Sequence, residues 1–363
     1  MNQFFPEIKK NFGFGCMRLP QNDTGIDSGV LCDMIDKFIA AGFNYFDTAR
    51  PYHGGMSEKM LKACLAERYD RSAYLLANKL SPTFFEKEEE IRPLIEDQLA
   101  TCGVEYFDFY LMHAMSAERH QKYLDTNAYE IAQQMKREGK LRHVGMSFHD
   151  TADALDQILT DRPELEFVQL QFNYVDYNDP KVQSRLCYEV CRKHGKPVMV
   201  MEPVKGGTLV NLPKEALELL PEGSPASYAI RYAAGFEDIV MVLSGMSNMA
   251  QLDDNLSYMT DFKPLSENEH RIIDKVRTLY QAQHKIPCTA CRYCVDGCPA
   301  GIPIPEIFSL MNRKLGGEEA EKSTYDGFSA NIHACVDCGQ CESACPQTLH
   351  IRHLLKEVDK AFA

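Results

Sequence analysis

Short apolar runs alternate with longer amphipathic segments from residue 11 to about residue 259. The amphipathic segments repeat their apolar residues at helical spacing and close with glycine, as in GVLCDMIDKFIAAG and PKVQSRLCYEVCRKHG. The apolar runs have the length of buried strands, and there are eight: NFGFGCMRL, FNYFDTA, AYLLANKL, YFDFYLMHA, HVGMSF, FVQLQFNY, PVMVMEPV and IVMVLSGM. Eight strands alternating with helices predict a closed parallel (β/α)8 TIM barrel of the α/β class.

An open doubly wound sheet is the competing architecture for this alternation. Dinucleotide-binding sheets of that kind carry a GxGxxG turn between the first strand and the first helix. This chain has only GFGCM at the corresponding place. The closed barrel is therefore the predicted fold, and we assign it residues 1–264.

Two further segments follow the last predicted strand. A polar periodic stretch from Leu265 to about Gln283 predicts a connecting helix, placed at residues 265–284. Residues 285–363 contain two tight cysteine runs and, between them, PEIFSLMNRKL, which has helical periodicity. We expect these last residues to form a small separate domain.

Composition and charge exclude several classes of protein. With 363 residues, 45% of them hydrophobic and 25% charged, the chain can bury a sizeable core. The net charge of −13 argues against a nucleic-acid partner, because phosphate binding needs a local excess of Lys and Arg. No apolar run approaches ~20 residues, and the start, MNQFFPEIKK, has no apolar signal core. We therefore expect a cytoplasmic protein with no membrane partner; its oligomeric state stays open.

Four polar side chains stand near the ends of the second, third and fourth predicted strands. Asp47, Lys79 and His113 lie in the strand ends, and Tyr52 follows in the loop after Asp47. In a barrel these positions meet at one rim. A phenol has a pKa near ~10, and an adjacent ammonium such as Lys79 would lower the pKa of Tyr52 toward working pH. Asp47 would supply the counter-charge for Lys79. His113 would orient a carbonyl group or relay the proton.

These residues carry a resemblance to a known family. FDTARPYHGGMSE, followed by ANK and LMH at these spacings, is similar to the aldo-keto reductase superfamily over residues 11 to about 259. The resemblance implies a (β/α)8 barrel that reduces a small-molecule carbonyl substrate by hydride transfer from a nicotinamide cofactor. The catalytic tetrad that it implies, with the tyrosine as general acid, is Asp47, Tyr52, Lys79 and His113.

The resemblance also implies a set of cofactor-binding residues. Ser147 and Gln169 would hold the nicotinamide carboxamide, the loop at Gly206 and Gly207 would pass near the pyrophosphate, and GMSNMAQLDDN would run beside the adenosine. The full set is Gly15, Met17, Arg18, Ser147, Gln169, Met201, Gly206, Gly207, Gly245, Ser247, Gln251 and Asn255.

Three features depart from the family pattern. Met201 stands where relatives place an aromatic ring against the nicotinamide, and Phe148 follows Ser147 where asparagine is common. Relatives bind the adenosine 2′-phosphate with Lys or Arg, whereas this chain offers Gly245, Met246, Ser247 and Gln251. These differences leave NADP, NAD and a flavin open as the cofactor.

Eight of the fourteen cysteines form two runs, which favours metal ligation over disulfides in a chain of this kind. CTACRYCVDGCP and CVDCGQCESACP share the spacing C-x2-C-x2-C-x3-C-P. This spacing is typical of [4Fe–4S] clusters, with zinc as the alternative. In two-cluster ferredoxins the fourth cysteine of each run ligates the other cluster. The predicted ligands are Cys288, Cys291, Cys294 and Cys345 for one cluster, and Cys335, Cys338, Cys341 and Cys298 for the other.

The remaining cysteines are scattered, and we interpret them as inert packing residues: Cys16, Cys32, Cys64, Cys102, Cys187 and Cys191.

Residues 285–363 resemble the α-helical ferredoxin type, and a subgroup of aldo-keto reductases carries such a C-terminal domain. Three functions stay open. The first is an NAD(P)H-dependent carbonyl reductase with structural, sensing or electron-passing clusters. The second is an electron-transfer oxidoreductase, linked to a flavin, a ferredoxin or another electron carrier. The third is a redox-sensing interaction module.

Overall fold

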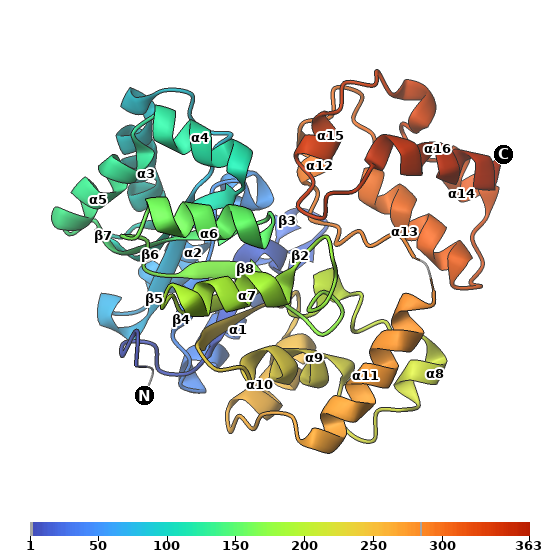
Figure 1. The fold of residues 1–363 in the computed structure, drawn as a ribbon, viewed down its shortest axis with the longest axis horizontal. Helices are drawn as coiled ribbons and strands as arrows, with labels where there is room; N and C mark the ends of the chain where they lie inside the picture. Colours follow the sequence, from blue (N-terminus) through green and yellow to red (C-terminus); the bar gives the residue numbers. More distant parts are fainter. Residues whose placement is uncertain (1–2, 284) are drawn as a thin grey trace. The chain divides into compact units, whose positions relative to one another are not determined.

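The computed structural model of the chain describes residues 3–283 and 285–363, so positions 1, 2 and 284 of the predicted ranges lie outside the described residues. The chain divides into two compact units (Figure 1). The barrel unit consists of Met1–Pro203 and Ala226–Ser266, and the C-terminal unit of Val204–Pro225 and Glu267–Ala363.

Eight parallel strands close into a barrel in the order β1-β10-β9-β8-β7-β6-β5-β4 (Figure 1). Their bounds are β1 (Phe12–Gly15), β4 (Tyr45–Asp47), β5 (Leu75–Leu80), β6 (Phe107–Met115), β7 (Leu141–Phe148), β8 (Val168–Gln171), β9 (Val198–Met201) and β10 (Ile239–Gly245). Each apolar run of the sequence forms one strand, so the predicted closed barrel is confirmed. A short antiparallel hairpin, β2 (Gln21–Asn22) with β3 (Gly25–Ile26), is an addition that the apolar pattern does not predict.

Helices alternate with these strands. In the barrel unit they are α1 (Ser28–Ala40), α2 (Met56–Leu61), α3 (Glu88–Cys102), α4 (Ala117–Asp125), α5 (Ala128–Arg137), α6 (Ala152–Asp161), α7 (Ser184–Lys193), α9 (Pro225–Ala234) and α10 (Met249–Met259). The first helix illustrates how the local sequence sets the bounds. Asp27 caps its N-terminus by accepting a hydrogen bond from the Val30 N–H, and its buried face repeats at helical spacing through Leu31, Ile35 and Phe38.

The interior of the barrel is a packed core. Inward side chains from the strands, among them Tyr45, Phe109 and Met199, form one buried cluster, to which the N-terminal segment adds Phe5 and Ile8. The strands are buried along almost their whole length, as expected for parallel strands covered by helices. Polar chemistry is therefore confined to the ends of the strands.

A charged cluster surrounds His143, near the start of β7. His143 Nε2 lies 2.7 Å from Glu7 Oε1, and His143 Nδ1 lies 3.0 Å from Glu166 Oε2. Burial opposes the charged imidazolium, but the hydrogen bonds and charges of Glu166 and Glu7 outweigh it and raise the pKa of His143. Burial likewise opposes ionisation of Glu166, yet hydrogen bonds from His143, Lys136 and the Val144 N–H lower the pKa of Glu166 to about 2.

The Glu166→Gln variant is expected to lose most stability between about pH 5 and pH 6.5. Glu166, with its depressed pKa, stabilises the fold above about pH 4.3 and loses that effect as the pH falls toward 2. The pKa of His143 is raised in the folded protein, so its contribution to stability is present at low pH and is lost as the pH rises through that folded-state pKa. The side chains are 24% and 28% exposed, so screening reduces the expected loss to about 1–2 kcal/mol.

Urea unfolding at pH 3, 6 and 8.5 measures this pH dependence. Glu189→Gln, which removes an exposed pair with Arg185, is the control. A loss for Glu166→Gln that stays constant across the three pH values would contradict the coupling with His143.

The C-terminal unit is helical. Its helices are α8 (Lys214–Leu217), α11 (Glu267–Gln281), α12 (Tyr293–Asp296), α13 (Ile304–Leu315), α14 (Lys322–Asp326), α15 (Gln340–Ser343) and α16 (Ile351–Phe362). The helices α11 and α13 lie where the periodic segments predict them. A buried cluster that includes Phe308, Leu355 and Val358 joins α13 to α16. Within the described residues, no helix combines the length and apolar character that crossing a membrane requires.

Candidate active site

The four residues of the predicted tetrad come together at the rim where the barrel strands end. Asp47 closes β4, Lys79 lies one residue before the end of β5, and His113 lies near the end of β6. Tyr52 opens a short 3-10 turn, Tyr52–Gly55, that follows β4. All four side chains are buried, and Lys79 is 0% exposed.

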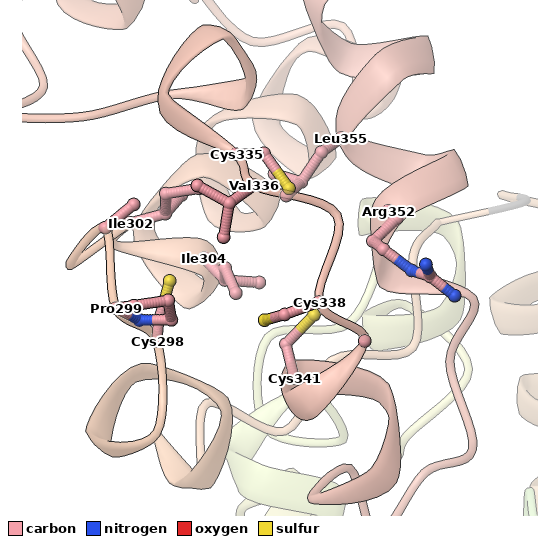
Figure 2. A pocket seen from close by; sticks show the side chains of 12 residues that line it. Cys298, Pro299, Ile302, Ile304, Cys335, Val336, Cys338, Cys341, Arg352 and Leu355 are labelled. Carbon is pink, nitrogen blue, oxygen red and sulfur yellow. The ribbon is translucent and has the colours of Figure 1, made fainter.

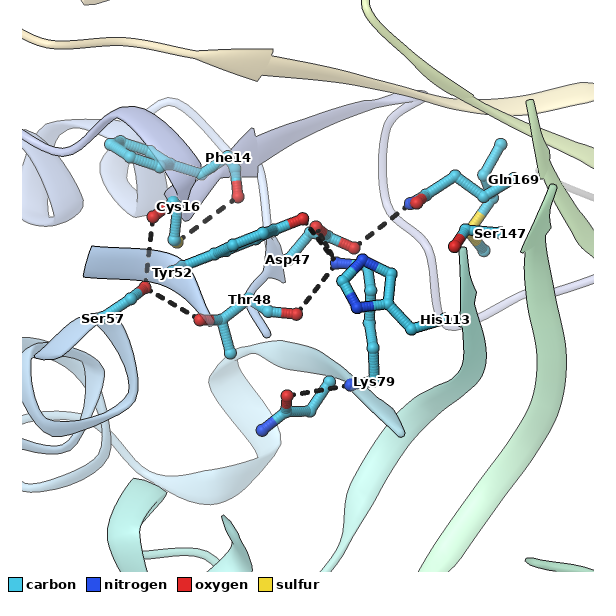
Figure 3. Close-up of polar contacts among 12 residues, drawn as sticks. Phe14, Cys16, Asp47, Thr48, Tyr52, Ser57, Lys79, His113, Ser147 and Gln169 are labelled. Carbon is cyan, nitrogen blue, oxygen red and sulfur yellow. Dashed lines mark hydrogen bonds and ion pairs between the residues drawn. The ribbon is translucent and has the colours of Figure 1, made fainter. Parts of the chain in front are cut away.

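Lys79 is the centre of the hydrogen bonding in this group (Figure 3). Its Nζ donates to Asp47 Oδ1 at 2.5 Å, to the Thr48 carbonyl oxygen at 2.9 Å and to Tyr52 Oη at 3.2 Å. An ammonium has three protons, so these contacts use its donor capacity in full. Burial lowers the pKa of Lys79, while the charge and hydrogen bond of Asp47 act in the opposite direction. The arrangement places one cation directly beside the Tyr52 hydroxyl.

His113 is held in its neutral form. Burial lowers the pKa of His113 well below its usual range, and the nearby positive charge of Lys79 acts in the same direction. Its Nδ1 lies 2.6 Å from Ser81 Oγ. Ser81 is a neighbour of the tetrad that the sequence analysis misses, although it stands only two residues after Lys79, in ANKLS.

Two of the predicted cofactor residues lie beside the tetrad. Ser147 on β7 and Gln169 on β8 are direct partners in the strand register, and both are buried. Gln169 Nε2 donates to Asp47 Oδ2 at 3.2 Å, and Ser147 Oγ accepts a hydrogen bond from the Ala114 N–H at 2.8 Å. Figure 3 shows Gln169 reaching toward Asp47, with Ser147 beside it. Met201 ends β9 in register with Gln171 and is partly exposed.

A second group of predicted cofactor residues lies where β1 and β10 end. Gly15 pairs with Gly245 in the strand register. The stem of Arg18 covers Gly245, where a Cβ would stand 3.2 Å from Arg18 Cβ. Ser247 Oγ donates to the Arg18 carbonyl oxygen at 3.0 Å. The turn Cys16–Arg18, which contains Met17, is thereby tied to the end of β10.

The two remaining residues of this group lie on α10. Gln251 Oε1 accepts a hydrogen bond from the Ser247 N–H at 2.7 Å. Asn255 is buried and donates to Ser244 Oγ at 2.8 Å. The helix N-terminus at Asn248 therefore adjoins the end of β10, where the resemblance expects the adenosine half of a dinucleotide.

Gly206 and Gly207 belong to the C-terminal unit. Gly206 has a φ of +64°, and a Cβ there would lie 2.5 Å from the Thr289 carbonyl oxygen. Thr289 is part of the first cysteine run, so this loop packs against that run within its own unit. Tyr280 on α11 fastens the same loop by donating to Thr208 Oγ1 at 2.9 Å.

The cysteine runs interleave in space. Cys298, from the first run, lines one cavity together with the first three cysteines of the second run, Cys335, Cys338 and Cys341 (Figure 2). Ile302, Ile304, Val336 and Leu355 supply apolar walls. Four thiols around an apolar hollow form a donor set suited to an iron–sulfur cluster. Within the described residues, no group of His, Cys, Asp or Glu lies close enough to hold a single metal ion.

The other four cysteines of the two runs also lie near one another. Burial raises the pKa of Cys294, and the neighbouring charges of Cys291, Cys288 and Cys345 add to this effect. Cys345 of the second run therefore lies with the first three cysteines of the first run. At the edge of the Cys298 cavity, Arg352 is paired with Glu342 at 2.7 Å and with Asp337 at 3.1 Å.

The interpretation of the scattered cysteines is wrong for two of them. Cys32 on α1 and Cys64 form a disulfide with a Cα–Cα distance of 4.8 Å. A separation of 32 residues carries no local signature, so only the packing of the two helical segments reveals the pair. The other four, Cys16, Cys102, Cys187 and Cys191, are free and buried.

Comparisons with known proteins agree with both parts of this arrangement. Residues 11–278 match the aldo/keto reductase family, and residues 287–349 match the 4Fe-4S dicluster domain. Similar proteins include the L-galactose dehydrogenase of Arabidopsis thaliana, 28% identical over 64% of this chain and 78% of that protein. The NADH-specific methylglyoxal reductase of Escherichia coli (strain K12) is 25% identical over 51% of this chain and 59% of that protein.

Solved structures share the barrel. Aldo-keto reductase AKR11C1 from Bacillus halodurans, in its holo form, matches with a TM-score of 0.61 at 24% identity, over 73% of this chain and 91% of that one. An aldo-keto reductase from Klebsiella pneumoniae in complex with NADPH matches with a TM-score of 0.61 at 17% identity, over 74% of this chain and 90% of that one. With its matched family region spanning the whole barrel, the chain belongs to the aldo/keto reductase family and is an oxidoreductase that carries a 4Fe-4S dicluster domain.

Proposed function

We propose that the protein reduces a small-molecule carbonyl compound to an alcohol with NADH or NADPH, and that Tyr52 is the proton donor. The observation that carries the proposal is the buried chain of contacts from Asp47 through Lys79 to Tyr52 Oη. The names of the similar methylglyoxal reductase and L-galactose dehydrogenase support a small, oxygen-rich substrate.

The chemistry divides into a hydride and a proton. A nicotinamide held beside Ser147 and Gln169 would supply the hydride to the carbonyl carbon. Tyr52 Oη gives its proton to the carbonyl oxygen, which becomes the hydroxyl group of the product. The phenolate left on Tyr52 faces the Lys79 ammonium 3.2 Å away, and this opposite charge stabilises it. Asp47 and the Thr48 carbonyl oxygen keep Lys79 in place during the transfer.

His113 assists as a hydrogen-bond donor. Its low pKa keeps the ring neutral at physiological pH. When Ser81 Oγ–H donates to Nδ1, the ring proton resides on Nε2, from which it can be donated to the carbonyl oxygen. A neutral donor polarises the carbonyl group without competing with Tyr52 as the acid.

The residues beside the tetrad fit the nicotinamide end of the cofactor. A carboxamide offers one acceptor and two donors, and the Ser147 hydroxyl and Gln169 amide can match both. Gln169 also donates a hydrogen bond to Asp47, the counter-charge of Lys79, so the same side chain would contact both the cofactor and the tetrad. We assign the adenosine end to the group formed by Arg18, Ser247 and Gln251.

We further propose that the C-terminal unit holds two [4Fe–4S] clusters with crossed ligands. The cavity lined by Cys298 and the second run would hold one of them, and the group around Cys294, with Cys345, the other. Such clusters exchange one electron at a time, whereas hydride transfer moves two. Electron exchange between the nicotinamide and the clusters would therefore require a two-to-one electron converter such as a flavin, whereas a ferredoxin could exchange single electrons with the clusters directly.

An anaerobic titration of the whole protein with NADH and with NADPH tests the reductase function. The nicotinamide absorbance and the cluster absorbance near 400 nm are recorded together, before and after addition of a panel of aldehydes, ketones and sugars. We expect nicotinamide oxidation only after a carbonyl compound is added, with the clusters unchanged.

Three other outcomes would overturn the proposal. Cluster bleaching by reduced nicotinamide without a carbonyl compound would favour electron transfer between cofactor and clusters. A yellow protein with tightly bound flavin, inactive toward the whole panel, would favour the flavin-linked alternative. Nicotinamide binding without any turnover would favour a redox-sensing role.

A further inference from the structure

A buried carboxylate outside the tetrad, Glu58 on α2, is 0% exposed. Its Oε2 forms an ion pair with Arg50 Nε at 2.8 Å. Its Oε1 accepts hydrogen bonds from Asn78 Nδ2 at 2.9 Å and from Gln98 Nε2 at 3.1 Å. Burial raises the pKa of Glu58, and the Asn78 hydrogen bond and the Arg50 charge oppose that rise. Burying this group is costly, so its partners must compensate.

These partners lie on both sides of the proposed proton donor. Arg50 stands two residues before Tyr52 and Glu58 six residues after it, so their ion pair closes the loop that carries the phenol. Asn78 directly precedes Lys79, and its Oδ1 accepts a hydrogen bond from the Lys79 N–H at 2.8 Å. Gln98 Nε2 also lies 3.1 Å from the Lys79 carbonyl oxygen. One carboxylate therefore connects the Tyr52 loop to the backbone on either side of Lys79.

The loop needs such a restraint because of its backbone. Three successive residues between Tyr52 and α2 have positive φ: His53 at 52°, Gly54 at 61° and Gly55 at 86°. A non-glycine residue in this region persists only where the surroundings hold it. Leu19 N–H donates to His53 Nε2 on one side of the turn, and the Arg50–Glu58 pair closes the other.

We infer that Glu58 is a positioning residue that sets the distance between Tyr52 Oη and Lys79 Nζ by clamping the Tyr52 loop to β5. The inference rests on the proposed function, since it assigns Glu58 an effect on proton transfer. Loss of the clamp should loosen the 3.2 Å contact without removing either partner.

The chain offers a matched control in Asp108, which is 1% exposed and paired with Arg71 at 2.5 Å and Arg142 at 3.0 Å. It also fastens β5, through the Leu76 N–H at 2.8 Å. Asp108, near the start of β6, thus fastens the start of β5 with the same chemistry as Glu58 but away from the rim. Asp108→Asn should lower stability as much as Glu58→Gln does and leave kcat unchanged.

The variants Glu58→Gln and Glu58→Ala are measured in the whole protein. In Glu58→Gln the side-chain oxygen can still accept a hydrogen bond from Asn78, but the charge that pairs with Arg50 is lost. Glu58→Ala removes both contacts. A misplacement of about 1 Å costs up to about 100-fold in rate, so we expect kcat to fall roughly 10-fold for Gln and 100-fold for Ala. The Kd for NAD(P)H should stay within about twofold of the parent.

The NMR spectrum of ¹³C-tyrosine-labelled protein reports the environment of the Tyr52 ring without any turnover. It therefore distinguishes failure of this inference from failure of the proposed function. The Tyr52 ring signal, assigned by its loss in Tyr52→Phe, should move in Glu58→Gln and stay in place in Asp108→Asn, whatever reaction the barrel performs. If Glu58→Gln does not fold, Arg50→Lys opens the same clamp and must move the signal. An unmoved Tyr52 signal in a folded clamp variant, or a kcat loss that Asp108→Asn reproduces, would overturn the assignment.

Discussion

Replacing Tyr52 with phenylalanine is expected to lower kcat for carbonyl reduction by about 10²–10⁴-fold. The substitution removes the hydroxyl that lies 3.2 Å from Lys79 Nζ and leaves the ring in place. Cofactor affinity should change little, because the proposed nicotinamide contacts come from Ser147 and Gln169. Anaerobic steady-state rates give kcat, and isothermal titration calorimetry gives the Kd for NADH and NADPH.

Tyr45→Phe is the matched control. Tyr45 lies on β4 two residues before Asp47, is 0% exposed, and its hydroxyl donates to the sulfur of Met199 at 3.2 Å. The same atom is deleted in both variants, so a difference in kcat between them isolates the role of the Tyr52 proton. Equal rates in the two variants would exclude Tyr52 as the acid.

The sequence predicts the barrel well because parallel strands leave a strong signal. The strands are buried almost throughout and form continuous apolar runs, and the last residues of each strand lie at the rim. Asp47, Lys79 and His113 follow directly from this rule. The hairpin of β2 and β3 has two residues in each strand, too few to produce an apolar run.

The contacts that complete the site are beyond a sequence pattern. Thr48 takes part through its carbonyl oxygen, which every residue possesses, and Ser81 through a hydroxyl that resembles any loop serine. The Cys32–Cys64 disulfide depends on how two helical segments pack. Long-range geometry decides all three, and periodicity does not encode it.

The loop Val204–Pro225 shows a further limit of the sequence. It follows β9 and would be assigned to the barrel by chain order, yet it groups with the C-terminal unit. Its contacts with Thr289 and Tyr280 explain this grouping, because they connect it to the first cysteine run and to α11. A loop that family resemblance associates with the cofactor thus has the cysteine-rich unit as its packing partner.

Cys298→Ser is expected to remove the cluster held by Cys335, Cys338 and Cys341, here called the second cluster. The first cluster, held by the other cysteines of the first run, should remain, although Cys298 belongs to that run. The reason is its place in the cavity lined by Cys335, Cys338 and Cys341. Iron should fall from about eight to about four atoms per chain, since each cluster holds four. The residual electron paramagnetic resonance spectrum of the reduced protein should match that of Cys335→Ser.

The reciprocal variant makes the test decisive. Cys345 belongs to the second run, but it lies with Cys288, Cys291 and Cys294. The residual spectrum of Cys345→Ser should therefore match that of Cys288→Ser. Cys187→Ser, at a free buried thiol of the barrel unit, should keep all the iron. If Cys298→Ser instead matches Cys288→Ser, each run holds its own cluster and the crossed ligand set is wrong. If the unmodified protein instead holds two zinc ions and no iron, both [4Fe–4S] assignments are wrong. The cysteine spacing would then mark zinc sites.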